Sequence, residues 1–376
     1  MHLVLVRTVA GLEKLAAEEV VAAGHRVVEV SKRQVVAEMS VLADPPRLAD
    51  DLFVVHAAVV DPGRTKDGLA AAIRSLELPS GSGAFAVSAS FVGERNFNRF
   101  AIEDLVGARL GGRYYSRRGG AVPPAERSEW RVVLDGKTLW VGLRPYAVPL
   151  HRRSWRTRTV RGSLHPPVAA AMARLAGIEP GHMVLDPFCG AGTLLLEAWA
   201  LEPRAAYTGI DRDPTAVAAA RENAAVAAAR GNAAFAAVCG NAAEAASPGT
   251  QCAARAARAA CAACAACAAC AACAACAACA AGAGGAGIRW ECGDAARLDI
   301  TADRIVTNPP WDRQVAIGDL SPYIRQWRRV LDGRLVAILN PQQAAQLARG
   351  WRVSAVYEVS VAGQHPRIVV AEPSRS

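Results

Sequence analysis

Short apolar runs that alternate with helical stretches occupy the second half of the chain and constrain its fold more than any other feature. After Pro180-Gly181 there are five such runs, at 184–185, 207–210, 288–291, 304–307 and 335–339. Helical or Ala-rich stretches separate most of them, which is typical of βαβ units that build a parallel sheet. Residues 353–361 and 367–370 flank Gly363-Gln364 and predict a hairpin. The pattern predicts a mostly parallel α/β fold with a terminal antiparallel hairpin.

The first 150 residues show a mixed pattern of strands and helices. Alternating apolar positions predict strands at 2–8, 26–30, 34–39 and 84–91, and a hairpin of 130–134 with 138–143 around Asp135-Gly136. Helical spacing predicts helices at 11–23 and 102–110. Residues 145–167 are rich in Pro and Arg and lack periodicity, and a helix is predicted at 168–176. We therefore predict an α+β domain over 1–150, a basic linker over 151–167 and the α/β domain over 168–376.

Positive charge is concentrated between residues 92 and 174. The chain has a formal net charge of +9, and this stretch holds 16 Arg or Lys against 6 Asp or Glu. All but one of the 16 are Arg, whose guanidinium binds phosphate through two parallel hydrogen bonds and stacks on bases. Six Tyr or Trp residues lie among them. A solvated basic face is one interpretation, and a surface that binds a polyanion in a salt-dependent way is the other.

An Ala-rich insertion at 233–287 interrupts the alternation. It contains 30 Ala in 55 residues, and from 252 to 279 every third residue is Cys or Arg. Three residues advance a helix by about 300°, so successive cysteines circle the helix and form no single metal-binding face. We interpret the segment as a low-complexity insertion, helical or disordered, and predict no metal site. Because Ala contributes little to membrane insertion and the N-terminus has no secretion signal, we predict a cytoplasmic protein without a membrane span.

The strongest local motif is Asp186-Pro187-Phe188-Cys189-Gly190-Ala191-Gly192-Thr193, which follows a predicted strand and precedes a helical stretch. A Gly-rich turn at this place lets backbone N–H groups and the helix start approach a ligand closely. A dinucleotide-binding loop needs a third Gly where this chain has Leu195. Asp186, at the strand end, is suited to hold an amine and would repel a diphosphate. The motif therefore predicts a ligand site that is not a dinucleotide loop.

Carboxylates also end the next two predicted strands. Asp211 can accept both hydroxyls of a ribose, and Asp294, followed by Ala295, can accept from an adenine amino group. A strand-end Asp can instead cap the following helix, but three in succession favour a nucleoside site. Residues 235–240 with Asn241 compete for the place of the third strand, and we prefer 288–294 because it supplies the acidic residue.

The fourth predicted strand ends in Thr307-Asn308-Pro309-Pro310-Trp311. Two prolines restrict the backbone and turn the preceding carbonyls outward. Asn308 then offers a side-chain acceptor and Pro309 a carbonyl, which match the two protons of an exocyclic amine. Trp311 adds a flat surface on which a base can stack. A tight turn without function is the alternative for such a sequence.

Together these motifs resemble the S-adenosylmethionine-dependent amino-methyltransferases, and more narrowly the THUMP-containing guanosine-N2 methyltransferases of tRNA and ribosomal RNA. The segments at 11–19, 151–156 and 163–169 resemble the same family. The resemblance covers nearly the whole chain except 233–287. One residue departs from the family pattern, because Asp312 stands where such enzymes often have Gly. It implies a Rossmann-like class I methyltransferase with a mostly parallel seven-stranded sheet, preceded by an α+β RNA-binding region of ferredoxin-like and THUMP type.

The resemblance also implies a function and its residues. We expect methyl transfer from S-adenosylmethionine to the N2 of a guanosine in structured RNA, with tRNA as the preferred target. The expected catalytic residues are Asn308, Pro309, Pro310 and Trp311. The expected cofactor-binding residues are Asp186, Phe188, Gly190, Gly192, Thr193, Asp211, Asp294, Ala295 and Asn308. The expected RNA-binding residues are Arg152, Arg153, Arg156 and Arg158.

Two alternatives to this function stay open at the level of sequence. Methylation of ribosomal RNA at guanosine-N2, or of nucleic acid at adenine-N6, keeps the chemistry and changes the target. A non-catalytic RNA-binding protein is the alternative of another class, with the insertion having inactivated the sheet. We expect RNA as the partner, no membrane association and no obligate protein partner.

Overall fold

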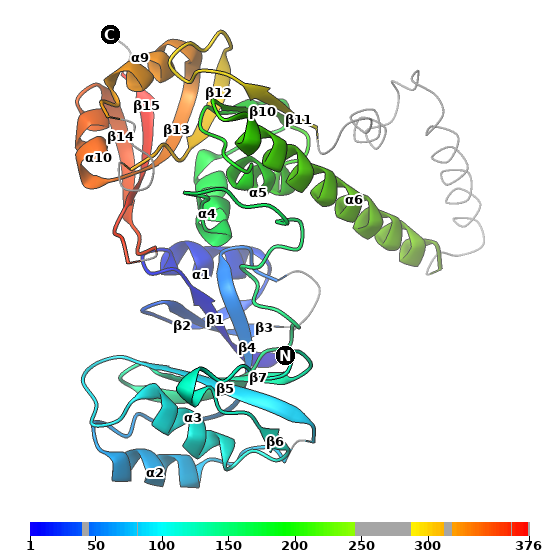
Figure 1. Ribbon diagram of the computed structural model, residues 1–376, viewed down its shortest axis with the longest axis vertical. Helices are drawn as coiled ribbons and strands as arrows, with labels where there is room; N and C mark the ends of the chain where they lie inside the picture. The colour runs from blue at the N-terminus through cyan, green and yellow to red at the C-terminus, as the bar shows by residue number, and fades with distance from the viewer. Residues whose placement is uncertain (40–44, 81, 245–286, 312–317, 362, 375–376) are drawn as a thin grey trace. The chain divides into compact units, whose positions relative to one another are not determined.

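The computed structural model describes residues 1–39, 45–80, 82–244, 287–311, 318–361 and 363–374, with side chains of 230–244 left out (Figure 1). The chain divides into two compact units, Met1–His151 and Arg152–Ser376. Most of the Ala/Cys insertion, including all seven cysteines of 261–279, lies outside the described residues, as does Asp312. The predictions for the cysteine repeat and for the residue after Trp311 therefore stay predictions.

The first unit is built on one mixed eight-stranded sheet in the order β2-β3-β1-β4-β8-β7-β5-β6. Its strands are β1 (His2–Thr8), β2 (Arg26–Ser31), β3 (Gln34–Met39), β4 (Ala49–Val60), β5 (Ala84–Phe91), β6 (Arg113–Tyr114), β7 (Ser128–Leu134) and β8 (Thr138–Leu143). Most neighbours are antiparallel, but β5 runs parallel to both β6 and β7. The predicted hairpin is confirmed, because β7 and β8 pair antiparallel across Asp135-Gly136.

Three helices belong to this unit: α1 (Glu13–Ala22), α2 (Lys66–Ser75) and α3 (Arg99–Gly107). Polar side chains start two of them, because Thr65 accepts a hydrogen bond from the Gly68 N–H and Asn98 accepts one from the Ala101 N–H. Leu69 and Ile73 of α2 and Ile102 of α3 pack in one buried cluster with residues of β5, β7 and β8. The α+β character predicted for this part of the chain is confirmed.

The second unit contains a seven-stranded sheet in the order β11-β10-β9-β12-β13-β15-β14. Its strands are β9 (Met183–Asp186), β10 (Ala206–Asp211), β11 (Ile288–Cys292), β12 (Ala302–Thr307), β13 (Leu331–Leu339), β14 (Trp351–Glu358) and β15 (Arg367–Pro373). Strands β9 to β13 run parallel to one another, and β15 is antiparallel to both β13 and β14. The predicted parallel sheet with a terminal antiparallel hairpin is therefore confirmed.

Helices cover both faces of this sheet. They are α4 (Pro166–Ala176), α5 (Thr193–Leu201), α6 (Pro214–Glu244), α9 (Ser321–Val330) and α10 (Pro341–Ala348) (Figure 1). Leu335, Ala337 and Leu339 of β13 are buried in one cluster with Trp327 of α9 and Leu347 of α10. Successive residues of a strand point to opposite faces, so the intervening residues of β13 face the other layer, where α4 packs on the sheet.

The structure decides between the two candidates for the third strand. Residues 288–292 form β11, whose backbone pairs in parallel with β10 from Tyr207↔Ile288 to Asp211↔Cys292. The competing residues 235–240 belong to helix α6. Their Ala-rich sequence favours a helix because Ala has the highest helix propensity. The preference for the segment that supplies Asp294 is confirmed.

The predicted linker over 151–167 begins at the division between the two compact units. Residues from Arg152 onward belong to the second compact unit, and the first two helical residues of α4 are Pro166 and Pro167. The segment lacks periodicity because it is held by side-chain hydrogen bonds rather than by a regular element, as described below. Among the residues that the structure describes, no helix is long and apolar enough to cross a membrane.

Gly209 on β10 provides a test of the packing behind the sheet edge. A Cβ atom at this position would lie 2.5 Å from the Trp290 ring and 3.0 Å from Cys189 Cβ. We expect Gly209→Ala to lower the free energy of unfolding of the second unit by roughly 1–3 kcal/mol, the usual cost of overpacking. Chemical denaturation measures this, with Gly350→Ala as the control because its nearest neighbour is 3.6 Å away. Equal stability of the two variants would contradict the packing argument.

Candidate active site

A cavity of about 1060 Å³ lies at the carboxyl ends of the parallel strands of the second unit. The strand order reverses there, because β9 has β10 on one side and β12 on the other. The connections after neighbouring strands leave in opposite directions at such a point, and this opens a crevice outside the strand ends. Asp186, Asp211 and Asn308, which end or follow these three strands, all line the cavity.

The Gly-rich turn after β9 is held tightly against β10 and β11. The Gly190 N–H donates to Asp211 Oδ2 at 2.9 Å, and the Cys189 N–H donates to the Ile210 carbonyl at 2.9 Å. Gly192 has a φ of 81°, and a Cβ atom there would lie 2.7 Å from the Trp290 ring. Any other residue at this position would meet both backbone strain and a steric clash. Gly192 therefore allows the turn to pack against the Trp290 ring, whereas Gly190 lines the cavity.

Asp186 is a buried carboxylate at the base of the cavity. Its side chain is 1% exposed, and its Oδ1 accepts a hydrogen bond of 3.0 Å from the Phe188 N–H. Burial raises the pKa of Asp186 to about 7, and the nearby negative charge of Asp211 acts in the same direction. The Phe188 N–H opposes the shift. Without a cationic partner this carboxyl is costly to ionise, which makes it a favourable site for an ammonium group.

Asp211 and Asp294 stand at the ends of the two neighbouring strands. Asp211 accepts hydrogen bonds from two backbone N–H groups, those of Gly190 at Oδ2 and Asp213 at Oδ1. Asp294 accepts from the Ala296 N–H, and its side chain is 56% exposed. These backbone donors orient both carboxylates, and each oxygen has lone pairs left for a ligand. Both carboxylates therefore bond to backbone N–H groups of the neighbouring turns and also line the cavity.

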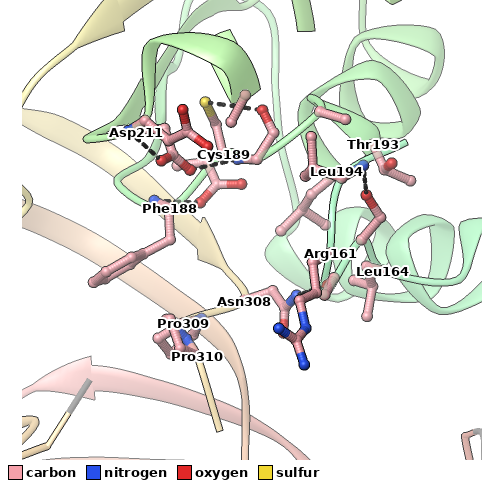
Figure 2. Close-up of a pocket in the computed structure, with 18 of the residues that line it drawn as sticks. Arg161, Leu164, Phe188, Cys189, Thr193, Leu194, Asp211, Asn308, Pro309 and Pro310 are labelled. Carbon is pink, nitrogen blue, oxygen red and sulfur yellow. Dashed lines mark hydrogen bonds between the residues drawn. The ribbon is translucent and has the colours of Figure 1, made fainter. Parts of the chain in front are cut away.

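Asn308, Pro309 and Pro310 lie across the cavity from Asp211 and Cys189 (Figure 2), and Trp311 also lines the cavity. Asn308 Nδ2 donates to the Gly162 carbonyl at 3.2 Å, while its Oδ1 is buried and has no hydrogen-bond partner among the described residues. Trp311 Nε1 donates to the Ile338 carbonyl at 3.1 Å, which fixes one edge of the indole. Gln343 Nε2 donates to the Pro310 carbonyl at 2.8 Å. The segment thus presents an unsatisfied acceptor beside an anchored aromatic ring.

Arg156 and residues 159–165 form a further wall of the cavity, where the sequence predicted a linker. Two buried contacts hold this part of the chain. Arg153 Nε pairs with Glu197 Oε1 of α5 at 2.7 Å, and the Glu197 side chain is fully buried. Asn223 of α6, also fully buried, accepts hydrogen bonds from the backbone N–H groups of Thr157 and Arg158. Buried polar groups are costly unless paired, so these contacts fix the segment in place.

The cavity also contains a cysteine thiol, that of Cys189 (Figure 2). Burial raises its pKa well above the usual value, and the carboxylates of Asp186 and Asp211 act in the same direction. The thiolate is the nucleophilic form of cysteine. Cys189 is therefore a protonated, unreactive part of the cavity wall near neutral pH.

The structure brings the predicted site residues together. Those that line the cavity are Asp186, Phe188, Gly190, Thr193, Asp211, Asp294, Ala295, Asn308, Pro309, Pro310, Trp311 and Arg156. The other predicted arginines do not line it, and two are paired with carboxylates, Arg153 with Glu197 and Arg158 with Glu222. Arg153 is held in a largely buried ion pair, and its role in RNA binding stays a prediction.

Sequence reasoning missed several residues that build the site. Three of them support the cavity without lining it: Asn223, Trp290 and Gln343. A fourth, Gly162, contacts Asn308 directly. One signal was present for Asn223, because it is a polar residue on the buried side of an Ala-rich helical stretch. A buried Asn in such a place usually has a hydrogen-bonding role. No pattern pointed to Gln343, whose contact with Pro310 spans 33 residues.

The arrangement of polar groups defines what the cavity can bind. It offers three carboxylates along one side and an amide oxygen next to an aromatic ring on the other. The carboxylates suit an ammonium group, a pair of sugar hydroxyls and an aromatic amine. The amide oxygen suits a second amine, carried by a planar group that stacks on Trp311. The cavity therefore fits two ligands, one of them a nucleoside with a cationic tail.

Comparison with known proteins identifies the family to which this geometry belongs. Residues 153–363, more than half of the chain, match the family UPF0020, described as an RMKL-like methyltransferase domain. The tRNA (guanine(6)-N2)-methyltransferase of Thermus thermophilus is 36% identical over 183 residues, 47% of this chain and 52% of the relative. The U6 snRNA (guanine-N(2))-methyltransferase THUMPD2 of Bos taurus is 39% identical over 84 residues, 22% of this chain and 16% of the relative.

The chain thus matches about half or less of the length of these curated relatives. A solved structure extends the likeness to both units. The crystal structure of TrmN from Thermus thermophilus has a TM-score of 0.67 and 24% sequence identity, and the match covers 99% of this chain and 100% of that chain. This likeness confirms the predicted α/β methyltransferase fold.

The raised pKa of Asp186 predicts how stability depends on pH. An unfolded Asp titrates near ~3.9, so between that pH and about 7 the native state binds more protons than the unfolded state. The free energy of unfolding should therefore fall as pH rises through this window. Asp186→Asn removes the titrating carboxyl, so the free energy of unfolding of this variant should not fall in this window. We expect it to exceed the free energy of unfolding of the wild type by ~1–4 kcal/mol at pH 7.5 and to match it near pH 4.

Chemical denaturation of the ligand-free chain from pH 4 to pH 8 measures this difference. Asp213→Asn is the matched control, because Asp213 is an exposed cavity residue whose capping contact with the Thr215 N–H an Asn can keep. We expect the control to follow the wild-type pH profile. A constant difference between Asp186→Asn and wild type at every pH would contradict the assignment.

Proposed function

The chain belongs to the UPF0020 family of RMKL-like methyltransferase domains, and from this premise we propose that it transfers a methyl group from S-adenosylmethionine to the exocyclic N2 of a guanosine in RNA, with tRNA as the preferred target. The observation that carries the proposal is the buried Oδ1 of Asn308, an acceptor without a partner among the described residues. It lines the same cavity as Trp311 and the three strand-end carboxylates. An acceptor in this place matches an amine N–H of a stacked base.

The residues of the cavity fit S-adenosylmethionine. Asp186, with one oxygen occupied by the Phe188 N–H, would accept from the ammonium group of the methionine part. Asp211 would accept from the ribose hydroxyls, and Asp294 from the adenine amino group. Phe188 stands beside them and makes an edge contact with Tyr323, with ring centroids 5.2 Å apart. When bound, the cofactor supplies an electrophilic methyl carbon on a sulfonium.

The residues around Asn308 would activate and orient the target amine. The nitrogen lone pair of such an amine is delocalised into its ring, which makes it a weak nucleophile. Hydrogen bonds from the amine protons to Asn308 Oδ1 and the Pro309 carbonyl favour a more tetrahedral nitrogen. Trp311 provides the surface on which the base, flipped out of its helix, would stack. Placement of the amine in line with the methyl carbon supplies the rest of the acceleration.

The choice of guanosine-N2 rests on the named relatives rather than on the cavity alone. Asn308 and Pro309 offer the same two acceptors to an adenine-N6 amine. Both curated relatives described above are named as guanine-N2 methyltransferases, one of tRNA and one of U6 snRNA. We therefore propose guanosine-N2 as the acceptor and tRNA as the RNA class, and the 1–150 region as the RNA-binding part of THUMP type.

Arg156 is the best-placed cavity residue for the RNA backbone. It lines the cavity, and its guanidinium has no ion pair or hydrogen bond with the part of the chain that the structure describes. Burial lowers the pKa of Arg156, as expected for a charge removed from water with no counterion among the described residues. A phosphate next to the flipped nucleotide would supply that counterion. Of the four predicted RNA-binding arginines, we propose Arg156 as the one with a specific contact, with Arg152 and Arg158 near it.

The proposed reaction is tested with purified protein, S-adenosylmethionine and unmodified tRNA transcripts, followed by nucleoside digestion and mass spectrometry. We expect N2-methylguanosine as the product. Asn308→Ala should lower the single-turnover rate by ~100-fold, the usual scale for the loss of one transition-state contact. Asp211→Ala should instead weaken cofactor binding, measured by calorimetry, because charge-assisted hydrogen bonds are lost. Methyl label found only in adenine would exclude the proposed target.

The role of Arg156 is tested by RNA binding as a function of salt. We expect Arg156→Gln to weaken binding of tRNA and to reduce the slope of log K against log salt by about one unit or less, the value for one phosphate contact. Cofactor affinity should not change. Arg204→Gln is the control, because Arg204 forms an exposed ion pair with Glu202 outside the cavity. An Arg156→Gln variant that matches this control in affinity and slope would show that Arg156 contacts no phosphate.

A further inference from the structure

The amide of Asn308 has two ends, and only one orientation serves the proposed reaction. Its Nδ2 donates to the Gly162 carbonyl at 3.2 Å, and its Oδ1 is the acceptor without a partner. If the amide turned over, two acceptors would face each other at Gly162 and the NH₂ group would point at the target amine. The Gly162 carbonyl therefore selects the orientation in which the oxygen is available. Figure 2 shows Arg161, the neighbour of Gly162, beside Asn308.

The Gly162 carbonyl is held by a tight turn. The Ser163 N–H donates to the Val160 carbonyl at 3.1 Å, and the Val160 N–H donates to Ser163 Oγ at 3.0 Å. Gly162 occupies the third position of this turn with a φ of 80°. A type II turn requires a positive φ at that position, which favours Gly. The direction of the carbonyl thus depends on the turn and on the absence of a side chain at Gly162.

The turn is connected to the cofactor loop through Asn223. The side-chain oxygen of Asn223 accepts from the N–H groups of Thr157 and Arg158, at 3.0 and 2.9 Å. Its Nδ2 donates to the carbonyls of Arg158 and Ala191, each at 2.9 Å. Ala191 is part of the Gly-rich turn after β9. One fully buried amide therefore joins the segment that precedes the 160–163 turn to the loop that borders the cofactor site.

We propose that Gly162 and Asn223 are positioning residues for the methyl transfer: Asn223 holds residues 157–158 against the cofactor loop, and the Gly162 carbonyl that follows orients the amide of Asn308 toward the target amine. This inference rests on the proposed function. Neither residue touches a reacting atom in this scheme, and both act through Asn308. Their effect should therefore appear in the rate of methyl transfer and disappear when Asn308 itself is removed.

The experiment is a double-mutant cycle in which single-turnover rates are measured on tRNA transcripts. It compares wild type, Gly162→Ala, Asn308→Ala and the double variant. We expect Gly162→Ala to lower the rate by ~10-fold or more, because a small misplacement of a reacting pair is costly. In the Asn308→Ala background the same change should lower the rate by less than about twofold. The affinity for S-adenosylmethionine, measured by calorimetry, should stay within about twofold in Gly162→Ala.

Gly181→Ala is the matched control for backbone strain. Gly181 has a φ of 84°, is exposed, and a Cβ atom there would have no neighbour within 4 Å. It therefore carries the same strain as Gly162→Ala without a contact to Asn308, and we expect a wild-type rate. Asn223→Ala, alone and combined with Asn308→Ala, is the second variant. Tyr207→Phe is its control for lost buried hydrogen bonds, because the Tyr207 hydroxyl bonds to the Ala198 and Glu202 carbonyls away from the cavity.

The outcomes separate this inference from the proposed function. If Asn308→Ala lowers the rate and the loss from Gly162→Ala or Asn223→Ala persists in full in that background, the positioning role is wrong while the function stands. If Gly162→Ala has the same rate as Gly181→Ala, the positioning role is also wrong. If Asn308→Ala keeps the wild-type rate, or if wild type forms no N2-methylguanosine, it is the proposed function that fails. A non-additive loss of rate at constant cofactor affinity supports the inference.

Discussion

The reversal of strand order between β9 and its neighbours β10 and β12 is the constraint on which the rest of the second unit depends. Parallel strands need crossover connections, and where these diverge no chain covers the strand ends. The crevice left there becomes the cavity, so the residues that end the three strands face a common space. Gly192 and Gly209 allow the Trp290 ring to pack directly behind them. The backbone of the cofactor loop is thus supported by a rigid aromatic surface.

The electrostatics of the cavity favour a cationic ligand. Asp186 is buried beside a second carboxylate, and burial together with that charge raises its pKa to about 7. An ammonium group would pair with the ionised form and remove the penalty, so ligand binding and ionisation support each other. Arg156 carries a positive charge that is also partly buried and has no counterion among the described residues. The two uncompensated charges mark the proposed places of the cofactor amine and an RNA phosphate.

The segment from Arg152 to His165 is an irregular stretch of chain that side-chain contacts hold in place. Its backbone N–H groups at Thr157 and Arg158 are bonded to the buried Asn223, and its Arg153 pairs with the buried Glu197. To break either contact would remove a hydrogen bond or an ion pair from a buried polar group, which is costly. The segment therefore forms a wall of the active site, and its conformation sets the direction of the carbonyl that Asn308 contacts.

The sequence by itself determined the sheet, its terminal hairpin and the three strand-end positions Asp186, Asp211 and Asn308, because strand periodicity and turn residues are local signals. It also identified the segment that precedes Asp294, rather than residues 235–240, as the third strand of the sheet, because that segment supplies an acidic residue at its end. Only the tertiary structure decided that Arg153 is an internal ion-pair partner while Arg156 faces the cavity. It alone joined Asn223 to Ala191, and Gly162 to Asn308 across 146 residues. Such contacts leave no periodic trace in the sequence, because they depend on which elements meet in space.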